Sequence, residues 1–363
     1  MQTKSIITNL LVFIISVSFI SCNPDPEPLD IPSEYVSANF ETNTISETTV
    51  INELSELADA LNIAEANAQS ETVSAISYPT SLASVTLSTY KDLIDSWLIE
   101  LVKAANSSTG FQMPDANGPA NGEEGGLLGS RLLDENGLEL EQMIEKGSFS
   151  AAFYNHALSV VNGNLSSSAS IDQLIKVFGT DISFNAETAK GPAKYAKRRS
   201  NNDSKTGVFY DIKTNLITAK AAIEAGEDYN TERDEALDAF LLNWEKSNFA
   251  TVINYCNATK LLLQEATSLS GEEREAKLGD AMHAYAEGVG FTSGLKGIAE
   301  KQITDAQIDA ILDLLLAPIG ETPTSYRFLN QASLLANLDQ IIDDIKAIYD
   351  FTDEEVISFY ANN

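Results

Sequence analysis

The sequence predicts an all-α protein, built as one helical bundle or as two bundles packed together, with a short extended segment near its N-terminus. Apolar residues recur every three or four positions in nearly every segment after residue 45, which is the spacing of one helix face. The alternation that is typical of a strand occurs only at residues 35–40 (YVSANF). Helix caps also mark helix starts, with a capping box at Ser270 and Glu273 and with caps at Thr304, before Asp305 and Gln307, and at Thr352, before Asp353, Glu354 and Glu355.

The first helical segment covers residues 51–68. Leu54, Leu57 and Leu61 share one face of this helix, and Glu53 and Glu56 lie outside that face. The same spacing predicts further helices over residues 93–102, 138–146, 151–161, 171–178, 212–225, 233–267, 274–291, 305–316 and 333–350. Between the predicted helices at residues 93–102 and 138–146, residues 113–126 are rich in glycine, asparagine and proline, which predicts a flexible loop.

Residues 1–21 have the pattern of a lipoprotein signal peptide. Lys4 supplies the positive start, and residues 10–20 form an apolar run too short to span a bilayer as a mature helix. The run ends in FISC, with a small residue directly before Cys22, as a lipoprotein signal peptidase requires. We therefore expect lipidation of Cys22 and membrane attachment through that lipid. The alternatives are a plain secretory signal or an uncleaved membrane anchor.

Residues 22–34 form an acidic, proline-rich tether, and residues 35–363 form the helical domain. A tether of this kind keeps a folded domain clear of the membrane because it contains nothing to bury. It also resembles the acidic segment that follows the lipidated cysteine in lipoproteins exported to the outer face of the outer membrane. The expected location is the outer membrane, on the cell surface if this resemblance extends to export.

The net charge of −30, from 23 basic and 53 acidic residues, makes nucleic acid an unsuitable partner. One basic run departs from this balance, with Lys190, Lys194, Lys197, Arg198, Arg199 and Lys205. It is interpreted either as an exposed helix end and loop or as a docking patch for an acidic partner or anionic ligand. The chain has two cysteines, so lipidation of Cys22 leaves Cys256 without an intramolecular partner, and its apolar neighbours predict a buried, inert thiol.

Common catalytic motifs are missing from the sequence. The chain has two histidines and no HExxH helix, nucleophile elbow, phosphate-binding loop or dinucleotide fingerprint. Standard hydrolases and nucleotide-dependent enzymes are therefore disfavoured, and the sequence does not identify a cofactor.

The strongest candidate for a site lies at residues 279–291 (GDAMHAYAEGVGF). At helical spacing Asp280, His283 and Glu287 share a face, with one acid a turn before the imidazole and one a turn after it. This arrangement is interpreted as a metal or proton-handling site, completed by an acid from another helix such as Glu245. The alternative is a core histidine that hydrogen-bonds to Asp280 or Glu287.

Several stretches in this order resemble a family of Bacteroidota lipoproteins known as domain of unknown function 4856. They are residues 35–40, 137–142, 145–152, 244–246 (WEK), 253–255 and 283–291. The resemblance implies an all-helical outer-membrane lipoprotein, distantly similar to imelysin-like proteins and found in settings associated with iron acquisition. Imelysins carry a GxHxxE motif, whereas three residues separate Gly279 from His283 and three separate His283 from Glu287 here.

Three functions remain open on this basis. The first is a non-catalytic envelope or cell-surface binding or accessory protein that works with outer-membrane uptake proteins for iron or haem. The second is a metal-dependent, imelysin-like hydrolase centred on His283 and Glu287. The third is a structural envelope lipoprotein.

Overall fold

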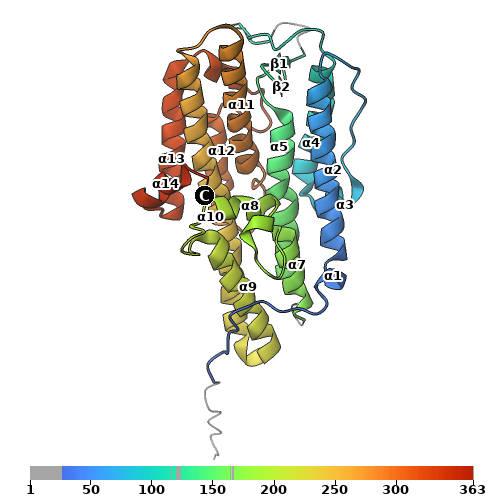
Figure 1. Cartoon of the computed structure of the whole chain (residues 1–363), viewed down its shortest axis with the longest axis vertical. Helices are drawn as coiled ribbons and strands as arrows, with labels where there is room; N and C mark the ends of the chain where they lie inside the picture. Colours follow the sequence, from blue (N-terminus) through green and yellow to red (C-terminus); the bar gives the residue numbers. More distant parts are fainter. Residues whose placement is uncertain (1–26, 116, 120–123, 164, 166, 363) are drawn as a thin grey trace, which may run out of the picture.

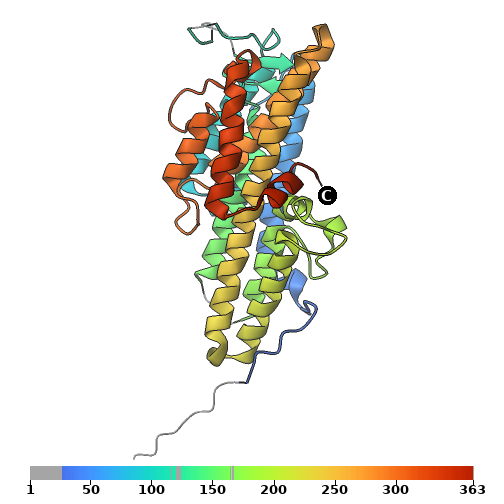
Figure 2. The ribbon, with the colours of Figure 1, turned by 90° about the vertical axis from the view of Figure 1, so that its left-hand side faces the viewer.

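The structure, a computed structural model, describes residues 27–115, 117–119, 124–163, 165 and 167–362. Its α-helices form an elongated bundle, and helix α10, Asn230–Ala266, runs along almost the whole length of that bundle (Figures 1 and 2). At 1.5 Å per residue, its 37 residues span about 55 Å. The only sheet in the described part of the chain has two strands, so the all-α prediction is confirmed.

The other elements follow the order of the chain. The N-terminal half contains α1 Phe40–Asn43, α2 Ile45–Asn67, α3 Thr80–Val85, α4 Ser88–Ala105, β1 Gly126–Leu128, β2 Arg131–Leu133, α5 Leu140–Ser148, α6 Asn155–Val161 and α7 Ala169–Phe178. The C-terminal half contains α8 Gly191–Arg198, α9 Val208–Ala225, α11 Gly271–Ser293, α12 Asp305–Leu314, α13 Leu335–Tyr349 and α14 Asp353–Phe359. Short 3₁₀ turns lie at Ala186–Thr188, Glu227–Tyr229, Ser325–Leu329 and Ala332–Leu334.

A π-helical segment, Phe149–Tyr154, joins α5 to α6 into one continuous rod. The sequence predicted two separate helices here. The wider π turn changes the pattern of backbone acceptors, and the carbonyl of Ala151 accepts a hydrogen bond from the backbone N–H of Leu87, 2.8 Å away. This bond ties the start of α4 to the middle of the rod.

The predicted strand at residues 35–40 is wrong. The segment pairs with no other strand in the described part of the chain, and its side chains make the contacts instead. The hydroxyls of Tyr35 and Ser37 and the amide of Asn43 each donate to the carboxylate of Asp172 over 2.7 Å. The segment therefore docks onto α7 without a sheet, with Tyr35 and Phe40 buried and with Phe40 as the first residue of α1.

The sheet that does form is an antiparallel hairpin of β1 and β2. It begins at Gly126, the last residue of the predicted loop 113–126. Residues 116 and 120–123 of that loop lie outside the described residues.

The predicted caps at Thr304 and Thr352 are confirmed, and each forms a capping box, with Gln307 and Glu355. The predicted capping box at Ser270 is wrong, because the side chain of Ser270 makes no cap hydrogen bond. Gly271 follows it with φ of +57°, so the chain enters α11 from the left-handed region.

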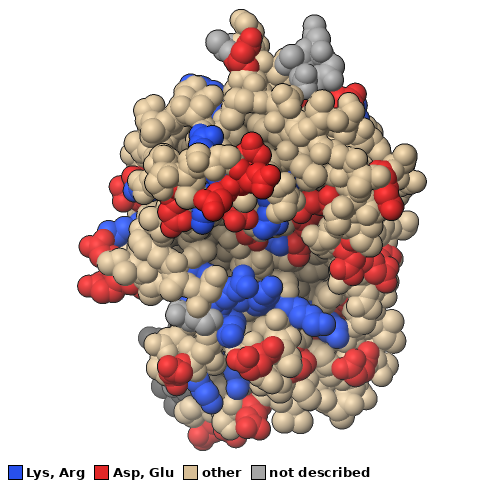
Figure 3. Space-filling view, turned by 45° about the horizontal axis from the view of Figure 1, so that its top comes forward, with Lys and Arg blue, Asp and Glu red and all other residues tan. Residues whose placement is uncertain are grey.

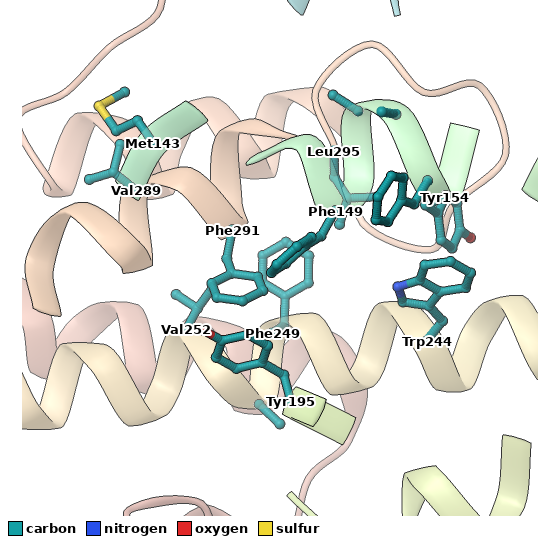
Figure 4. Packing of buried hydrophobic residues seen from close by; sticks show 14 of the residues in the cluster. Met143, Phe149, Tyr154, Tyr195, Trp244, Phe249, Val252, Val289, Phe291 and Leu295 are labelled. Carbon is teal, nitrogen blue, oxygen red and sulfur yellow. The ribbon is translucent and has the colours of Figure 1, made fainter. Parts of the chain in front are cut away.

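Buried aromatic side chains fill the centre of the bundle (Figure 4). Phe149 of the π-helical segment packs against Phe291 of α11 and Tyr195 of α8, with ring centroids 6.0 and 5.8 Å apart. Trp244 of α10 meets Tyr154 edge-on at 5.5 Å. Aromatic pairs of this kind contribute about 0.5–1.5 kcal/mol each beyond the area that they bury.

Glycines allow α5 and α11 to approach closely. A Cβ atom built on Gly294 would lie 2.3 Å from the carbonyl oxygen of Gly147, and one on Gly290 would lie 3.0 Å from that of Gln142. The contact therefore excludes a side chain at Gly294. A Cβ on Gly288 would meet only Tyr255, at an ordinary 3.5 Å.

We expect Gly294→Ala to destabilise the protein by about 1–3 kcal/mol, because the added methyl group forces α5 and α11 apart. Gly288→Ala is the matched control on the same helix, and we expect a neutral or slightly stabilising effect. Urea unfolding of both variants measures the difference. Equal stabilities for the two variants would contradict this account of the helix contact.

The N-terminal segment leaves the bundle at the end formed by the turn from α9 to α10 (Figure 1). There the hydroxyl of Tyr229 donates to the backbone carbonyl of Glu27 over 2.7 Å. The β hairpin lies at the opposite end. Residues 1–21, Cys22 and the first part of the tether lie outside the described residues, and none of the described helices is both long and apolar enough to cross a membrane.

Candidate functional site

His283 makes its shortest polar contact with Glu139, a residue just before α5. Its Nδ1 lies 2.9 and 3.0 Å from the two carboxylate oxygens of Glu139. Burial lowers the pKa of His283 and raises that of Glu139, which also lies beside the carboxylate of Glu65. When Glu139 is ionised it accepts a hydrogen bond from Nδ1–H, and in that tautomer the neutral imidazole has its lone pair on Nε2.

Asp280 does not contact His283. Its side chain is half exposed, and Oδ1 lies 3.6 Å from the guanidinium of Arg131 on β2. Arg131 also lies 3.8 Å from Glu139 and 4.0 Å from Glu65 of α2. Arg131 thus joins three acids from separate segments of the chain and partly neutralises them.

Glu287, one turn after His283 on α11, is the point where four elements converge. Its Oε2 lies 3.8 Å from Nε2 of His283, and its Oε1 accepts a hydrogen bond of 3.3 Å from the hydroxyl of Tyr195 on α8. The ammonium of Lys146 on α5 lies 3.7 Å from the same Oε1. Burial and the neighbouring Tyr195 and Glu287 raise the pKa of Tyr255 on α10, which shares a hydrogen bond with Glu287.

Lys146 carries the main positive charge beside Glu287 and Tyr195. Burial lowers the pKa of Lys146, but the carboxylates of Glu145 and Glu287 raise it by more, so the ammonium stays charged. Lys146 also forms an ion pair with Glu145. On the same helix, burial raises the pKa of Glu141 to about 8, although Lys146 opposes this shift.

Glu245 lies elsewhere and does not complete the site at His283. It is almost fully buried on α10, and it accepts hydrogen bonds of 2.8 Å from the backbone N–H groups of Gln302 and Ile303. The hydroxyl of Tyr349 donates to it over 2.6 Å. Its role is to hold the loop before α12 and the end of α13.

The basic run lies on and after α8, and Lys and Arg side chains form a band across the middle of the face shown in Figure 3. Lys194 is exposed, and Lys197 pairs with Glu187 at 3.7 Å. Arg199 departs from the expected exposed helix end, since it is only 5% exposed. Its guanidinium donates to the backbone carbonyl of Phe359 and to the side chain of Asn362.

Cys256 is buried on α10, and burial raises the pKa of its thiol to about 12. A thiol with this pKa is protonated at neutral pH and is a poor nucleophile. The prediction of a buried, inert cysteine is confirmed.

The sequence did not identify Glu139, Arg131, Lys146 or Tyr195 as parts of the cluster. Glu139 is 144 residues from His283, and no local pattern connects the two. One feature of the sequence could have indicated Glu139, since it stands between two leucines, Leu138 and Leu140. The structure shows that all three residues are buried. A carboxylate within an apolar stretch needs a buried partner.

No protein-family model, curated protein or solved structure matches the chain. In the part of the chain that the structure describes, no group of three or more His, Cys, Asp and Glu side chains is arranged to hold a metal ion. Any metal site at Glu287 would therefore need donors of another kind, and the hydroxyls of Tyr195 and Tyr255 are the ones nearby.

We expect His283→Ala to destabilise the metal-free protein by about 1–3 kcal/mol, because Glu139 loses its hydrogen-bond donor while it remains buried. Asp280→Ala is the control on the same helix face, and a half-exposed ion pair contributes little to stability. Thermal melts in the presence of a chelator measure both variants. A loss for Asp280→Ala as large as that for His283→Ala would contradict this reading.

Proposed function

We propose that the chain is a lipid-anchored, non-catalytic binding protein of the cell envelope, that it works beside an outer-membrane uptake system for iron or haem, and that it binds ferric iron at Glu287. The observation that carries the binding role is the arrangement of Glu139, His283 and Glu287. Glu139 holds Nδ1 of the imidazole, and Nε2 faces the carboxylate of Glu287. A carboxylate that fixes a histidine in this way is typical of metal sites, because it orients the ring and increases the basicity of the free nitrogen.

The phenol groups supply the remaining donors. Ferric iron is a hard cation that prefers anionic oxygen, and phenolates and carboxylates provide it. Tyr195 and Tyr255 converge on Glu287 from α8 and α10, and burial raises the pKa of both phenols. Both are therefore protonated in the metal-free protein, and iron binding must release protons. We expect the affinity to fall as pH falls.

Lys146 competes with a metal ion for Glu287, so binding requires Glu287 to leave the ammonium. Its ammonium neutralises Glu287 when no cation is present, which makes the empty cluster stable in a buried place. Since Lys146 also pairs with Glu145, it keeps a carboxylate partner when Glu287 binds a metal ion.

The anchor rests on the sequence around Cys22, and the fold gives it an orientation. The tether leaves at the α9–α10 end, whereas α11, which carries His283 and Glu287, lies in the other half of the bundle (Figure 1). An anchor at Cys22 therefore holds the binding cluster away from the membrane, where a partner protein can reach it.

Titration of the metal-free protein with ferric nitrilotriacetate tests the proposed site. We expect a visible phenolate-to-iron charge-transfer band that saturates near one equivalent and weakens in Tyr195→Phe. Glu139→Gln should lower the affinity by roughly 10–100-fold, as is common for residues that orient a metal ligand. Tyr210→Phe, on α9 and outside the cluster, is the control and should bind as the wild type does. The absence of a band, or an unchanged band in the Tyr195→Phe, Tyr255→Phe double variant, would refute the site.

A further inference from the structure

A second candidate site is a cavity of about 370 Å³ where the end of α8, the start of α9, the middle of α10 and α14 meet. A cavity of this volume lies within the range of small-molecule sites. Its apolar wall is formed by Tyr349, Phe351 and Phe359, and none of the residues around Glu287 lines it. Its lining therefore differs from that of the proposed iron site, although Tyr195 and Tyr255 are near enough to Arg199 to raise its pKa.

Two cations that have no carboxylate partner among the described residues line this cavity. The guanidinium of Arg199 is buried, its Nη atoms donate to a carbonyl and an amide oxygen, and its enclosed Nε has no acceptor in the described part of the chain. Lys246 of α10 is half-buried and makes no hydrogen bond or ion pair within the described residues. No described carboxylate lies within 4.0 Å of either cation, although the chain carries a net charge of −30. Burial lowers the pKa of Arg199 to about 10, although the neighbouring phenol of Tyr255 opposes this shift.

The acids of the cavity lie toward its exterior. Asp211 and Asp350 are exposed, and burial raises the pKa of Asp211 while Lys246 lowers it. The carboxylate of Glu355 is engaged at the start of α14, where it accepts hydrogen bonds from the N–H and the hydroxyl of Thr352. The positive charges are thus deeper than the negative ones. A ligand must bring one negative charge past an acidic rim, which favours a monoanion over a phosphate dianion.

We propose that this cavity binds a small organic carboxylate, with the carboxylate held by Lys246 beside the positive charge of Arg199 and the apolar body packed against Tyr349, Phe351 and Phe359. The ammonium of Lys246 supplies three N–H donors for the carboxylate oxygens, and the guanidinium of Arg199 adds a positive charge beside them. The aromatic wall accounts for an apolar body, since burial of that surface contributes to binding.

Benzoate is the probe that tests this proposal, and benzamide is its uncharged counterpart of nearly the same shape. Isothermal titration of the full chain in detergent should show benzoate binding at least about tenfold more tightly than benzamide, because a charge-assisted hydrogen bond contributes more than a neutral one. Equal binding of the two compounds, or binding of neither, overturns the proposal.

Variants that each remove one charge test whether benzoate binds in this cavity. Lys246→Gln should weaken benzoate binding about tenfold, and Asp211→Asn should strengthen it, because it removes a negative charge from the rim. Lys213→Gln, on α9 but outside the lining, changes the net charge by the same amount as Lys246→Gln and should leave binding unchanged. Unchanged binding in Lys246→Gln, or an equal loss in Lys213→Gln, overturns the assignment. Arg199 is not varied, since its loss would also release the carbonyl of Phe359; the gain in Asp211→Asn provides a readout that misfolding cannot mimic.

Discussion

Cys22→Ser is expected to abolish lipid attachment completely. The thioether to diacylglycerol forms on a thiol, and a hydroxyl cannot replace it, so the precursor should remain uncleaved and lack lipid. Incorporation of a radioactive fatty acid, followed by separation of membrane and soluble fractions, measures this effect.

Cys256→Ser is the matched control, because it removes the other cysteine of the chain from a buried position on α10. It should retain full labelling. A labelled Cys22→Ser protein would exclude lipidation at Cys22, and the proposed anchor and orientation would fail with it.

Glu141→Gln should give the second largest effect, a gain in stability at alkaline pH. Glu141 is 4% exposed, and burial raises its pKa from 4.5 to about 8. The folded state therefore binds a proton that the unfolded state releases near pH 4.5. The stability from this group is fully present below pH 4.5 and is lost as pH rises through about 8.

Glutamine keeps the shape of the protonated acid and removes its ionisation. We expect urea unfolding free energies of the variant to exceed those of the wild type by roughly 2–4 kcal/mol at pH 9, and the two proteins to be similar at pH 5. Glu275→Gln, at an exposed position of α11, should follow the wild type at both pH values. A parallel pH dependence for wild type and Glu141→Gln would show that Glu141 ionises freely in the folded protein.

The periodicity of the sequence was enough to predict most of the helices, because a helix that buries one face must repeat apolar residues at that spacing. The periodicity did not predict α8. Its basic residues suggested an exposed helix end and loop, although Tyr195 and Ala196 of this helix are buried. The periodicity was misleading at residues 35–40, where Tyr35 is buried against Asp172 and Phe40 is buried at the start of α1, and no strand forms among the described residues.

The candidate site was predicted in part. The spacing of His283 and Glu287 follows from helix geometry, and the structure places Nε2 of the imidazole 3.8 Å from the carboxylate. Their partners come from α5, α8 and α10 and the segment before α5, so only the packing of the bundle determines them. Glu245 shows the same limit, since a buried acid on a neighbouring helix bonds to the loop at residues 302–303 and not to His283.

The proposed iron site at Glu287 is tested most directly by elemental analysis of the wild type and of Glu287→Gln, each purified in mild detergent from the envelopes of iron-replete cells. We expect about one iron atom per chain in the wild type, and less than about a tenth of that in the variant, because the amide removes the charged oxygen that a hard cation needs. An iron-free wild type, or equal iron in both proteins, would contradict the proposed site.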